Sequence, residues 1–303
     1  MSHTSTAVIL MAYGTPRTRE QIEPYYTDIR RGRPPTPEQL AELTARYDAL
    51  GGTSPLAQRT DAQRDALQHA LNELAPGQYH VVLGLKHAEP MIETAVEAVI
   101  DEGYRDLVGL VLAPHYSSYS IGQYLGRARA AAEPHGATVR GVESWATEAA
   151  FIEFIATDLR VRLAELPAGS KVVFTAHSLP QRIVEGGDPY PDQIRATAEA
   201  VAAAVGLPDE QWMTAWQSAG RTPEPWLGPD ILEVIDRLAA EGTPGVVVSA
   251  VGFVADHLEV LYDLDIEAAA RAEALGLPFT RTACVNDDPA VMTALAHRVI
   301  AAA

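Results

Sequence analysis

The stretch Val8-Ile9-Leu10-Met11-Ala12-Tyr13-Gly14-Thr15-Pro16 returns in the same design 164 positions later, as Val172-Val173-Phe174-Thr175-Ala176-His177-Ser178-Leu179-Pro180. Each copy consists of an apolar run, an alanine, one ring-bearing residue and a turn closed by proline. If both runs are first strands of parallel sheets, Tyr13 and His177 lie at the carboxyl ends of strands, where open α/β sheets bind their ligands. The repeat therefore predicts two related halves, whose two rings could face each other across one cleft.

The rest of the chain alternates short β-branched runs with longer Ala-rich stretches of helical period. This alternation predicts parallel sheets covered by helices, with strands at residues 7–11, 80–85, 107–113, 139–142, 171–175, 212–216, 245–251 and 279–284. Four predicted strands in each half favour an α/β fold of two doubly wound lobes, although periodicity alone also permits one eight-stranded barrel. We expect an N-terminal lobe over residues 1–144, a C-terminal lobe over residues 145–285, and a C-terminal helix over residues 286–303 that packs back on the first lobe.

Three segments interrupt this pattern. Residues 23–37 combine tyrosines, arginines and four prolines and are expected to be a helix running into a stiff excursion. Residues 186–192 and 217–229 are rich in glycine and proline and are expected to be loops. Irregular segments of this kind often carry function in a compact domain.

The composition narrows the class of protein. The chain has 303 residues, 47% of them apolar, and a formal net charge of −17, which argues against nucleic acid or an anionic membrane surface as a partner. No apolar run approaches the roughly 18 residues of a membrane span, and no export signal is visible. Cys284 is the single cysteine, which excludes an internal disulfide and a four-cysteine iron–sulfur cluster. We expect a cytoplasmic monomer.

Three acidic residues follow the predicted strand at residues 245–251. Glu259, Asp263 and Glu267 are spaced at i, i+4 and i+8 in a segment expected to be helical from residue 256, so they would line one helix face. Like charges at this spacing destabilise a helix, and solvent or a cation must offset the repulsion. The series is therefore either a solvated acidic face or a track for a cation such as ferrous iron or Mg2+, both of which accept oxygen ligands.

His177 alone indicates either a hydrogen-bonded loop residue or a base. Paired with Glu259, it would suit a reaction that removes protons near neutral pH. Arginines are concentrated in the first half around Arg30 and Arg46, and their guanidinium groups either bind substrate carboxylates or pair with the abundant Asp and Glu. Neither of the glycine-rich phosphate-binding patterns is present, which argues against a nucleotide site.

Six motifs spread over nearly the whole chain carry a family resemblance. They are Met11-Ala12-Tyr13-Gly14-Thr15-Pro16, Gly51-Gly52-Thr53-Ser54-Pro55-Leu56, Thr175-Ala176-His177-Ser178-Leu179-Pro180, Trp216-Gln217-Ser218, Trp226-Leu227-Gly228-Pro229 and Val251-Gly252-Phe253-Val254-Ala255-Asp256-His257-Leu258-Glu259. In this order they resemble the signatures of the ferrochelatases. The resemblance implies a two-lobed chelatase-like fold that clamps a porphyrin between its lobes.

The resemblance also implies roles for individual residues. His177 matches the family's histidine and Glu259 its glutamate, which implies that these two are catalytic. Asp263 and Glu267 match acidic residues that line the metal route. Tyr13 resembles the coproporphyrin III branch of monoderm bacteria, in which this tyrosine can ligate iron from the face opposite the histidine. The implied metal contacts are thus His177, Glu259, Tyr13, Asp263 and Glu267, with Mg2+ a candidate at the last two.

Substrate contacts follow from the same branch. Coproporphyrin III carries four propionates, for which an arginine-rich first lobe offers partners. The implied contacts to the propionates or the ring are Tyr13, Thr15, Arg30, Arg46, Tyr47, Ser54 and Tyr124. Some relatives hold an iron–sulfur cluster on several cysteines; this chain, with Cys284 alone, departs from them, and no cluster is expected.

The expected function is therefore insertion of Fe2+ into coproporphyrin III with release of two protons, in haem biosynthesis. Iron is a substrate in this reaction and no resident cofactor is required. Transient contacts with the upstream and downstream haem-pathway enzymes are expected. Two alternatives stay open: a protoporphyrin IX ferrochelatase, and a non-catalytic haem or porphyrin carrier, which would need Tyr13 but not the pair of His177 and Glu259.

Overall fold

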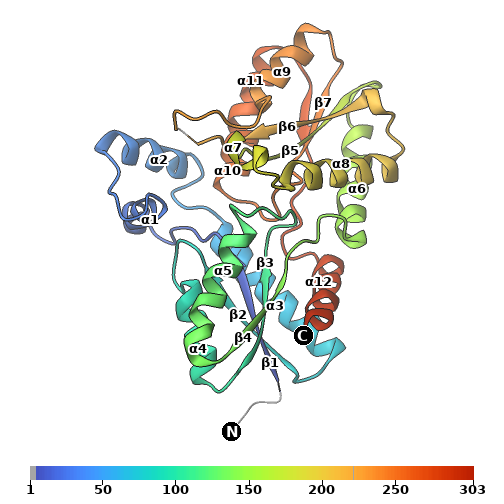
Figure 1. Cartoon of the computed structure of the whole chain (residues 1–303). Coiled ribbons are helices and arrows are strands. Elements are labelled where there is room, and N and C mark those ends of the chain that lie inside the picture. The colour runs from blue at the N-terminus through green and yellow to red at the C-terminus, as the bar shows by residue number, and fades with distance from the viewer. Residues whose placement is uncertain (1–4, 221) are drawn as a thin grey trace. The chain divides into compact units, whose positions relative to one another are not determined.

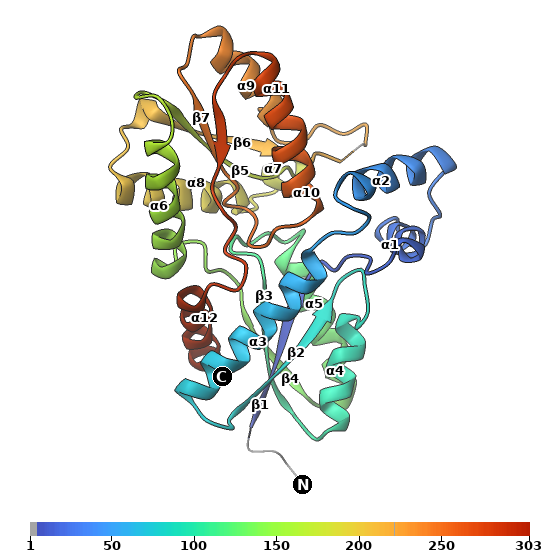
Figure 2. The ribbon, with the colours of Figure 1, turned by 180° about the vertical axis from the view of Figure 1, so that it is seen from behind.

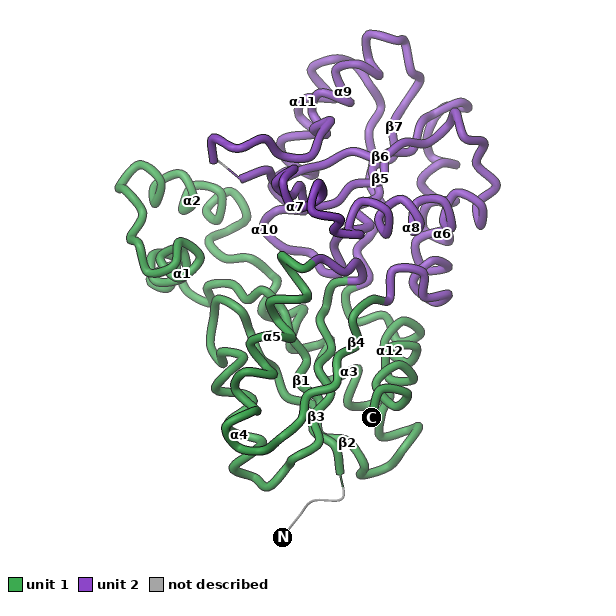
Figure 3. The backbone as a smooth tube through the Cα atoms, in the orientation of Figure 1, with its two compact units in different colours: residues 1–113, 118–144, 286–303 green, residues 114–117, 145–285 purple. Residues whose placement is uncertain are grey.

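The computed structural model describes residues 5–220 and 222–303. Residues 1–4 of the expected first lobe and Arg221 of the expected loop 217–229 lie outside the described residues. The chain forms two compact units (Figure 3). Unit 1 comprises Met1–Ala113, Ser118–Ser144 and Asn286–Ala303, and unit 2 comprises Pro114–Ser117 and Trp145–Val285.

Unit 1 is built on a parallel sheet with the strand order β2-β1-β3-β4. Its strands are β1 (Thr6–Ala12), β2 (Tyr79–Leu85), β3 (Asp106–Val111) and β4 (Thr138–Val142). β1 pairs in parallel with both β2 and β3. Its residues from Ala7 to Met11 are completely buried, which explains why its sequence is an unbroken apolar run rather than an alternating one.

Helices cover both faces of this sheet (Figure 1). Helices α4 (Ile92–Asp101) and α5 (Ile121–Ala132) pack against each other on one face. On the other face, α12 (Pro289–Ala302) packs along α3 (Leu56–Leu74), as Figure 2 shows from behind. The remaining elements of this unit are η1 (Arg19–Gln21), α1 (Ile22–Ile29), α2 (Pro37–Ala49) and η2 (Glu133–His135).

Unit 2 repeats this plan with the strand order β6-β5-β7-β8. Its strands are β5 (Lys171–His177), β6 (Trp212–Gln217), β7 (Val246–Ser249) and β8 (Phe279–Arg281), all parallel. In each unit the first strand of the sequence is flanked by the second and the third. The point between the first and third strands is therefore the place at which the connections change direction, and ligands of such sheets bind there, beyond the carboxyl ends of the strands.

The helices of unit 2 also form two layers. α6 (Ala149–Ala164) packs against α8 (Tyr190–Val205), and α9 (Ile231–Ala240) packs against α11 (Ala269–Ala274). The shorter elements are α7 (Gln181–Glu185), the 3-10 turn η3 (Asp209–Gln211), α10 (Leu258–Val260) and the π-helix η4 (Leu261–Ala268). η4 lies in the same buried cluster as α9 and β7, to which it contributes Leu264 and Ala268.

The predicted fold class is confirmed, and each predicted strand is present in the described part of the chain. Three predicted strands ran past their ends: β3 ends at Val111 rather than at residue 113, β7 at Ser249 rather than at residue 251, and β8 at Arg281 rather than at residue 284. The expected loop 186–192 was partly wrong, because α8 already begins at Tyr190. Its second residue, Pro191, is accepted there because the first turn of a helix does not use the backbone N–H that proline lacks.

Local sequence signals fix several helix ends. Thr36 caps α2 and forms a reciprocal capping box with Gln39, and Asp230 does the same for α9 with Glu233. Gly206 ends α8 in the left-handed conformation that favours glycine. No helix within residues 5–220 and 222–303 combines the length and the apolar character required to cross a membrane.

Candidate functional site

His177 is the last residue of β5 and lies beside Gln217, the last residue of β6, in the register of the sheet. Its imidazole Nδ1 is 2.5 Å from the backbone carbonyl oxygen of Ser178. A carbonyl oxygen can only accept a hydrogen bond, so Nδ1 carries the hydrogen and donates it. In the neutral ring this leaves Nε2 with a free lone pair, ready to accept a proton.

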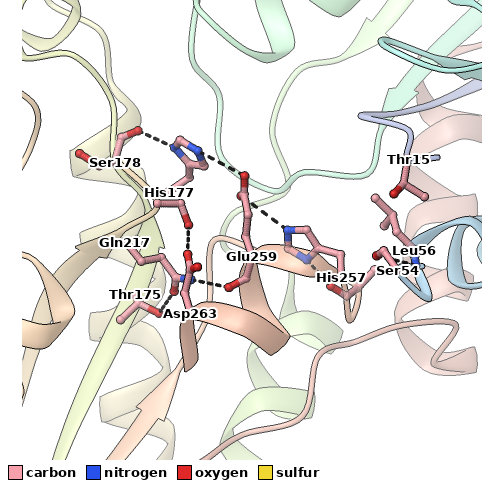
Figure 4. Close-up of polar contacts among 12 residues, drawn as sticks. Thr15, Ser54, Leu56, Thr175, His177, Ser178, Gln217, His257, Glu259 and Asp263 are labelled. Atoms are coloured by element: carbon pink, nitrogen blue, oxygen red, sulfur yellow. Dashed lines mark hydrogen bonds and ion pairs between the residues drawn. The ribbon is translucent and has the colours of Figure 1, made fainter. Parts of the chain in front are cut away.

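Glu259, in α10, places its carboxylate between two imidazole rings (Figure 4). Its Oε1 lies 3.8 Å from His177 Nε2, and its Oε2 lies 3.7 Å from His257 Nε2. The Nδ1 of His257 is 2.9 Å from the carbonyl oxygen of Ala255 and donates to it, as His177 Nδ1 does to Ser178. Both rings are therefore anchored to the backbone by Nδ1 and present Nε2 to one carboxylate, which can form an ion pair with whichever ring is protonated.

A buried glutamine ties this arrangement to the sheet. The hydroxyl of Thr175 donates to Gln217 Oε1 over 3.0 Å, and Gln217 Nε2 donates to the backbone carbonyl of Glu259 over 3.3 Å. Gln217 is 1% exposed and Thr175 is fully buried. An amide with both ends bonded has one orientation, so Gln217 fixes the backbone of Glu259 relative to the end of β5.

Tyr190 supports His177 from behind. Its hydroxyl donates to the backbone carbonyl of His177 over 3.1 Å, and its ring packs on Trp216 at a centroid distance of 5.8 Å. Burial, together with the charges of Glu259 and Asp188, raises the pKa of the Tyr190 hydroxyl above its usual range. The hydroxyl therefore remains a donor at every physiological pH.

The acidic series differs from its expected geometry. Asp263 and Glu267 lie in the π-helix η4, so the predicted α-helical face is wrong: the turn of a π-helix is wider, and a four-residue step does not complete it. Asp263 is buried and accepts a hydrogen bond of 2.5 Å from the hydroxyl of Ser218, while Glu267 is half-buried. Ser218 has a φ of 59°, in the left-handed region, directly after β6. π-helical turns and such backbone conformations are frequent at functional sites.

Among residues 5–220 and 222–303, no group of three or more His, Cys, Asp or Glu side chains is arranged to hold a metal ion. The structure brings His177, His257 and Glu259 together, and it pairs Asp263 with Ser218. The role of Glu267 as a metal contact stays a prediction, as do the metal roles of the other predicted ligands.

Tyr13 directly follows β1 in unit 1 and is 41% exposed. Its ring lies 4.6 Å from the ring of His87 and meets Tyr25 edge-on at 6.5 Å. His87 Nδ1 is 2.6 Å from a carboxylate oxygen of Asp28. Burial lowers the pKa of His87 despite the opposing effect of Asp28, which favours a neutral ring beside Tyr13.

The other predicted substrate contacts are also in unit 1. The hydroxyls of Thr15 and Tyr47 are 3.3 Å apart and both residues are buried, as is Ser54, whose hydroxyl accepts a hydrogen bond from the backbone N–H of Leu56 (Figure 4). Tyr124, in α5, is buried as well. The structure thus joins Thr15 to Tyr47, whereas their contact with a ligand stays a prediction.

The two predicted arginines have different surroundings. The guanidinium of Arg30 lies 5.6 Å from the ring centroid of Tyr26 and donates to the backbone carbonyl of Arg33. Arg46 is in α2 and is half-buried. A guanidinium stacked on an aromatic ring retains donors for a carboxylate, so Arg30 is held in place without being neutralised by that contact.

Several residues in these clusters were not predicted as site residues. His87 follows β2 at the same edge of the sheet as Tyr13, and this position was the signal that could have identified it. His257 stands two residues before Glu259 in the quoted motif. The buttressing residue Gln217 stands in the quoted motif Trp216-Gln217-Ser218, but nothing in that motif indicates its hydrogen bonds to Thr175 and Glu259.

A comparison with known families identifies the class of protein. The family model described as Ferrochelatase matches residues 5–303, which is nearly the whole chain. This chain therefore belongs to the ferrochelatase family, and it is a metal chelatase.

Individual relatives agree. A protein of Halalkalibacterium halodurans named coproporphyrin III ferrochelatase is 44% identical over 301 residues, covering 98% of this chain and 96% of the relative. A protein of Geobacillus kaustophilus with the same name is 44% identical over 303 residues, covering 98% and 95%. Among solved structures, the sirohydrochlorin chelatase SirB from Bacillus subtilis subspecies spizizenii in complex with cobalt has a TM-score of 0.61 at 12% identity, covering 99% and 95%, which shows a shared fold.

Proposed function

We propose that this chain inserts Fe2+ into coproporphyrin III, giving Fe-coproporphyrin and two protons, as a step of haem biosynthesis. The observation that carries the proposal is the carboxylate of Glu259 between the Nε2 atoms of His177 and His257. Insertion of a divalent ion into a neutral porphyrin releases two pyrrole protons, so a base is chemically required. A ring that holds its own hydrogen on Nδ1 offers such a base at Nε2.

In the proposed reaction His177 Nε2 accepts a proton from a pyrrole nitrogen. The resulting imidazolium forms an ion pair with Glu259, whose Oε1 is 3.8 Å away, and this pairing stabilises the charge that develops. Gln217 and Tyr190 hold the backbones of Glu259 and His177 and so preserve this distance. His257 Nε2, on the other carboxylate oxygen, supplies a second acceptor through which the proton can leave.

Two features support coproporphyrin III as the porphyrin. The relatives from Halalkalibacterium halodurans and Geobacillus kaustophilus carry that substrate in their names. Arg30 keeps guanidinium donors that suit propionates, of which coproporphyrin has four and protoporphyrin IX two. Thr15, Arg46, Tyr47, Ser54 and Tyr124 are proposed as further contacts, with Tyr13 against the ring.

Iron is a substrate in this proposal, and no resident cofactor is included. His177, Glu259 and Tyr13 are proposed to contact the metal ion during insertion, with Asp263 and Glu267 as oxygen ligands that guide Fe2+ or hold Mg2+. Asp263 suits this role because burial strengthens the attraction between its carboxylate and a cation. The proposal places the enzyme in the cytoplasm as a monomer that contacts other haem-pathway enzymes transiently.

The test is anaerobic addition of Fe2+ to the purified chain with coproporphyrin III or protoporphyrin IX, followed through the absorption change on metallation. We expect faster turnover with coproporphyrin III. His177→Ala should abolish insertion while porphyrin binding, measured by fluorescence, is largely retained. His69→Ala, which removes an exposed histidine of α3, is the matched control and should remain active. Undiminished insertion by His177→Ala would rule out this assignment, and porphyrin binding without turnover would indicate a carrier.

A further inference from the structure

Lys86 follows β2 in unit 1 and is one of two lysines in the chain, with Lys171. Its ammonium donates to Gln123 Oε1 over 2.9 Å and lies 5.1 Å from the ring centroid of Tyr124. An ammonium has three donors. Within the described part of the chain the hydrogen bond to Gln123 occupies one of them.

Within residues 5–220 and 222–303, Lys86 has no carboxylate counterion. Arg127 donates to the backbone carbonyl of Lys86 over 2.8 Å and is itself neutralised by a two-pronged contact with Glu93 at 2.7 and 2.6 Å. Among the described residues no carboxylate forms an ion pair with Lys86. A half-buried cation that lacks a partner is costly in a folded protein, and the cost is recovered when an anion binds.

Nearby cations add to this positive character. Burial, with the charges of Arg127 and Arg31, lowers the pKa of Lys86 to about 8, so the side chain is still mostly protonated at neutral pH. The carboxylate of Asp28, near the end of α1, contacts the neighbouring residue His87. In a chain with a net charge of −17, Lys86 is therefore a local positive centre.

We propose that Lys86 binds a carboxylate side arm of the tetrapyrrole. The inference rests on the proposed function and adds to it a substrate contact that sequence comparison did not suggest. Tyr124, whose ring lies against the ammonium, is already a proposed substrate contact, and His87, the next residue, packs on Tyr13. The ammonium, with two donors left, gives a charge-assisted hydrogen bond to a propionate, and Gln123 and Tyr124 hold it in position.

Amine footprinting of the wild-type protein tests the contact without a mutation. Brief acetylation modifies Lys86, Lys171 and the terminal amine, and mass spectrometry gives the rate at each position. With saturating coproporphyrin III we expect the acetylation rate of Lys86 to fall at least several-fold while that of Lys171 is unchanged. Lys171 is a suitable internal control because its ammonium bonds the backbone carbonyl of Glu210 in unit 2.

Binding measurements give the second readout. Lys86→Met removes the charge and should raise the Kd for coproporphyrin III by roughly ten-fold, the usual effect of one hydrogen bond to a charged group. Lys86→Arg should restore most of the affinity, and Lys171→Met should leave it unchanged. The inference would be overturned if coproporphyrin III binds while the acetylation rate of Lys86 and the Kd of Lys86→Met stay unchanged. The proposed function would then still stand. Failure of the wild-type chain to bind any porphyrin would overturn both.

Discussion

The hydroxyl of Tyr190 donates a hydrogen bond to the backbone carbonyl of His177, 13 residues earlier in the chain, over 3.1 Å. Tyr190 is itself fixed at the start of α8, where its backbone N–H donates to Asp188 Oδ1. The other carboxylate oxygen of Asp188 accepts a hydrogen bond from Ser117. A chain of buried polar groups thus holds the backbone at the end of β5, from which the candidate base projects.

Tyr190→Phe removes this hydroxyl and keeps the ring. We expect kcat to fall several-fold with little change in KM for the porphyrin, because the His177 backbone loses its restraint while binding residues are untouched. The free energy of unfolding should drop by about 1 kcal/mol, as for one buried hydrogen bond. Steady-state kinetics and urea denaturation measure the two effects. Tyr104→Phe, at a buried tyrosine of unit 1, is the control for stability loss alone; equal kcat changes in both variants would contradict a positioning role.

Gly252→Ala should disturb the same strand end by another route. A Cβ at position 252 would lie 2.5 Å from the Cβ and 2.7 Å from the Cα of Ala176, the residue before His177. The backbone of Ala176 cannot move aside as a flexible side chain could. We therefore expect the free energy of unfolding to fall by about 1–3 kcal/mol and the activity to fall strongly. Gly126→Ala, in α5 with open space around it, should instead stabilise by about 0.5–1 kcal/mol. Thermal unfolding separates them; a stable, active Gly252→Ala variant would show that the contact is not restrictive.

His115 should make the free energy of unfolding of unit 2 fall as the pH is lowered. Its Nε2 is 2.8 Å from the hydroxyl of Thr197, which donates to the carbonyl of Ala146, and burial lowers the pKa of His115 to about 3. Between the unfolded value of about 6.5 and this folded value, the unfolded state binds a proton that the folded state does not. The contribution of His115 to the free energy of unfolding is therefore fully present above about pH 6.5. Below that pH it falls by about 1.4 kcal/mol per pH unit.

Urea denaturation between pH 6 and pH 4.5 measures this slope. His115→Gln, which keeps a donor but does not titrate, should show a slope shallower by that amount. Parallel slopes for the wild type and the variant would mean that His115 is not held neutral in the folded protein. The carboxylates contribute equally to both proteins and cancel in the comparison.

The central strands could be predicted because burial on both faces demands an unbroken apolar run, as at β1 and β5. The same reasoning made the predicted strand β8 too long. Cys284 is apolar in character and 5% exposed, but it is buried against the helices rather than paired in the sheet. Apolar periodicity reports burial and not hydrogen bonding. The π-helix η4 was missed for the same reason, since its buried residues Leu264 and Ala268 are four positions apart, as they would be in an ordinary α-helix.

The site was only partly accessible to sequence reasoning. Position at a strand end singled out Tyr13 and His177, because topology brings such ends to one edge of a sheet. The anchoring of His177 Nδ1 on Ser178 and of His257 Nδ1 on Ala255 depends on loop backbone geometry, which no residue pattern specifies. Gln217 and Lys86 matter through distances to partners far away in the chain, and only the folded structure supplies these.

The common strand order of the two sheets bears on the origin of the chain. Two halves of one topology, with first strands 164 positions apart, are what duplication and fusion of a gene for a single half would produce. At matching positions at the ends of the two first strands, one half carries the exposed phenol of Tyr13 and the other the imidazole of His177, so one topology presents two different chemistries at its two switch points.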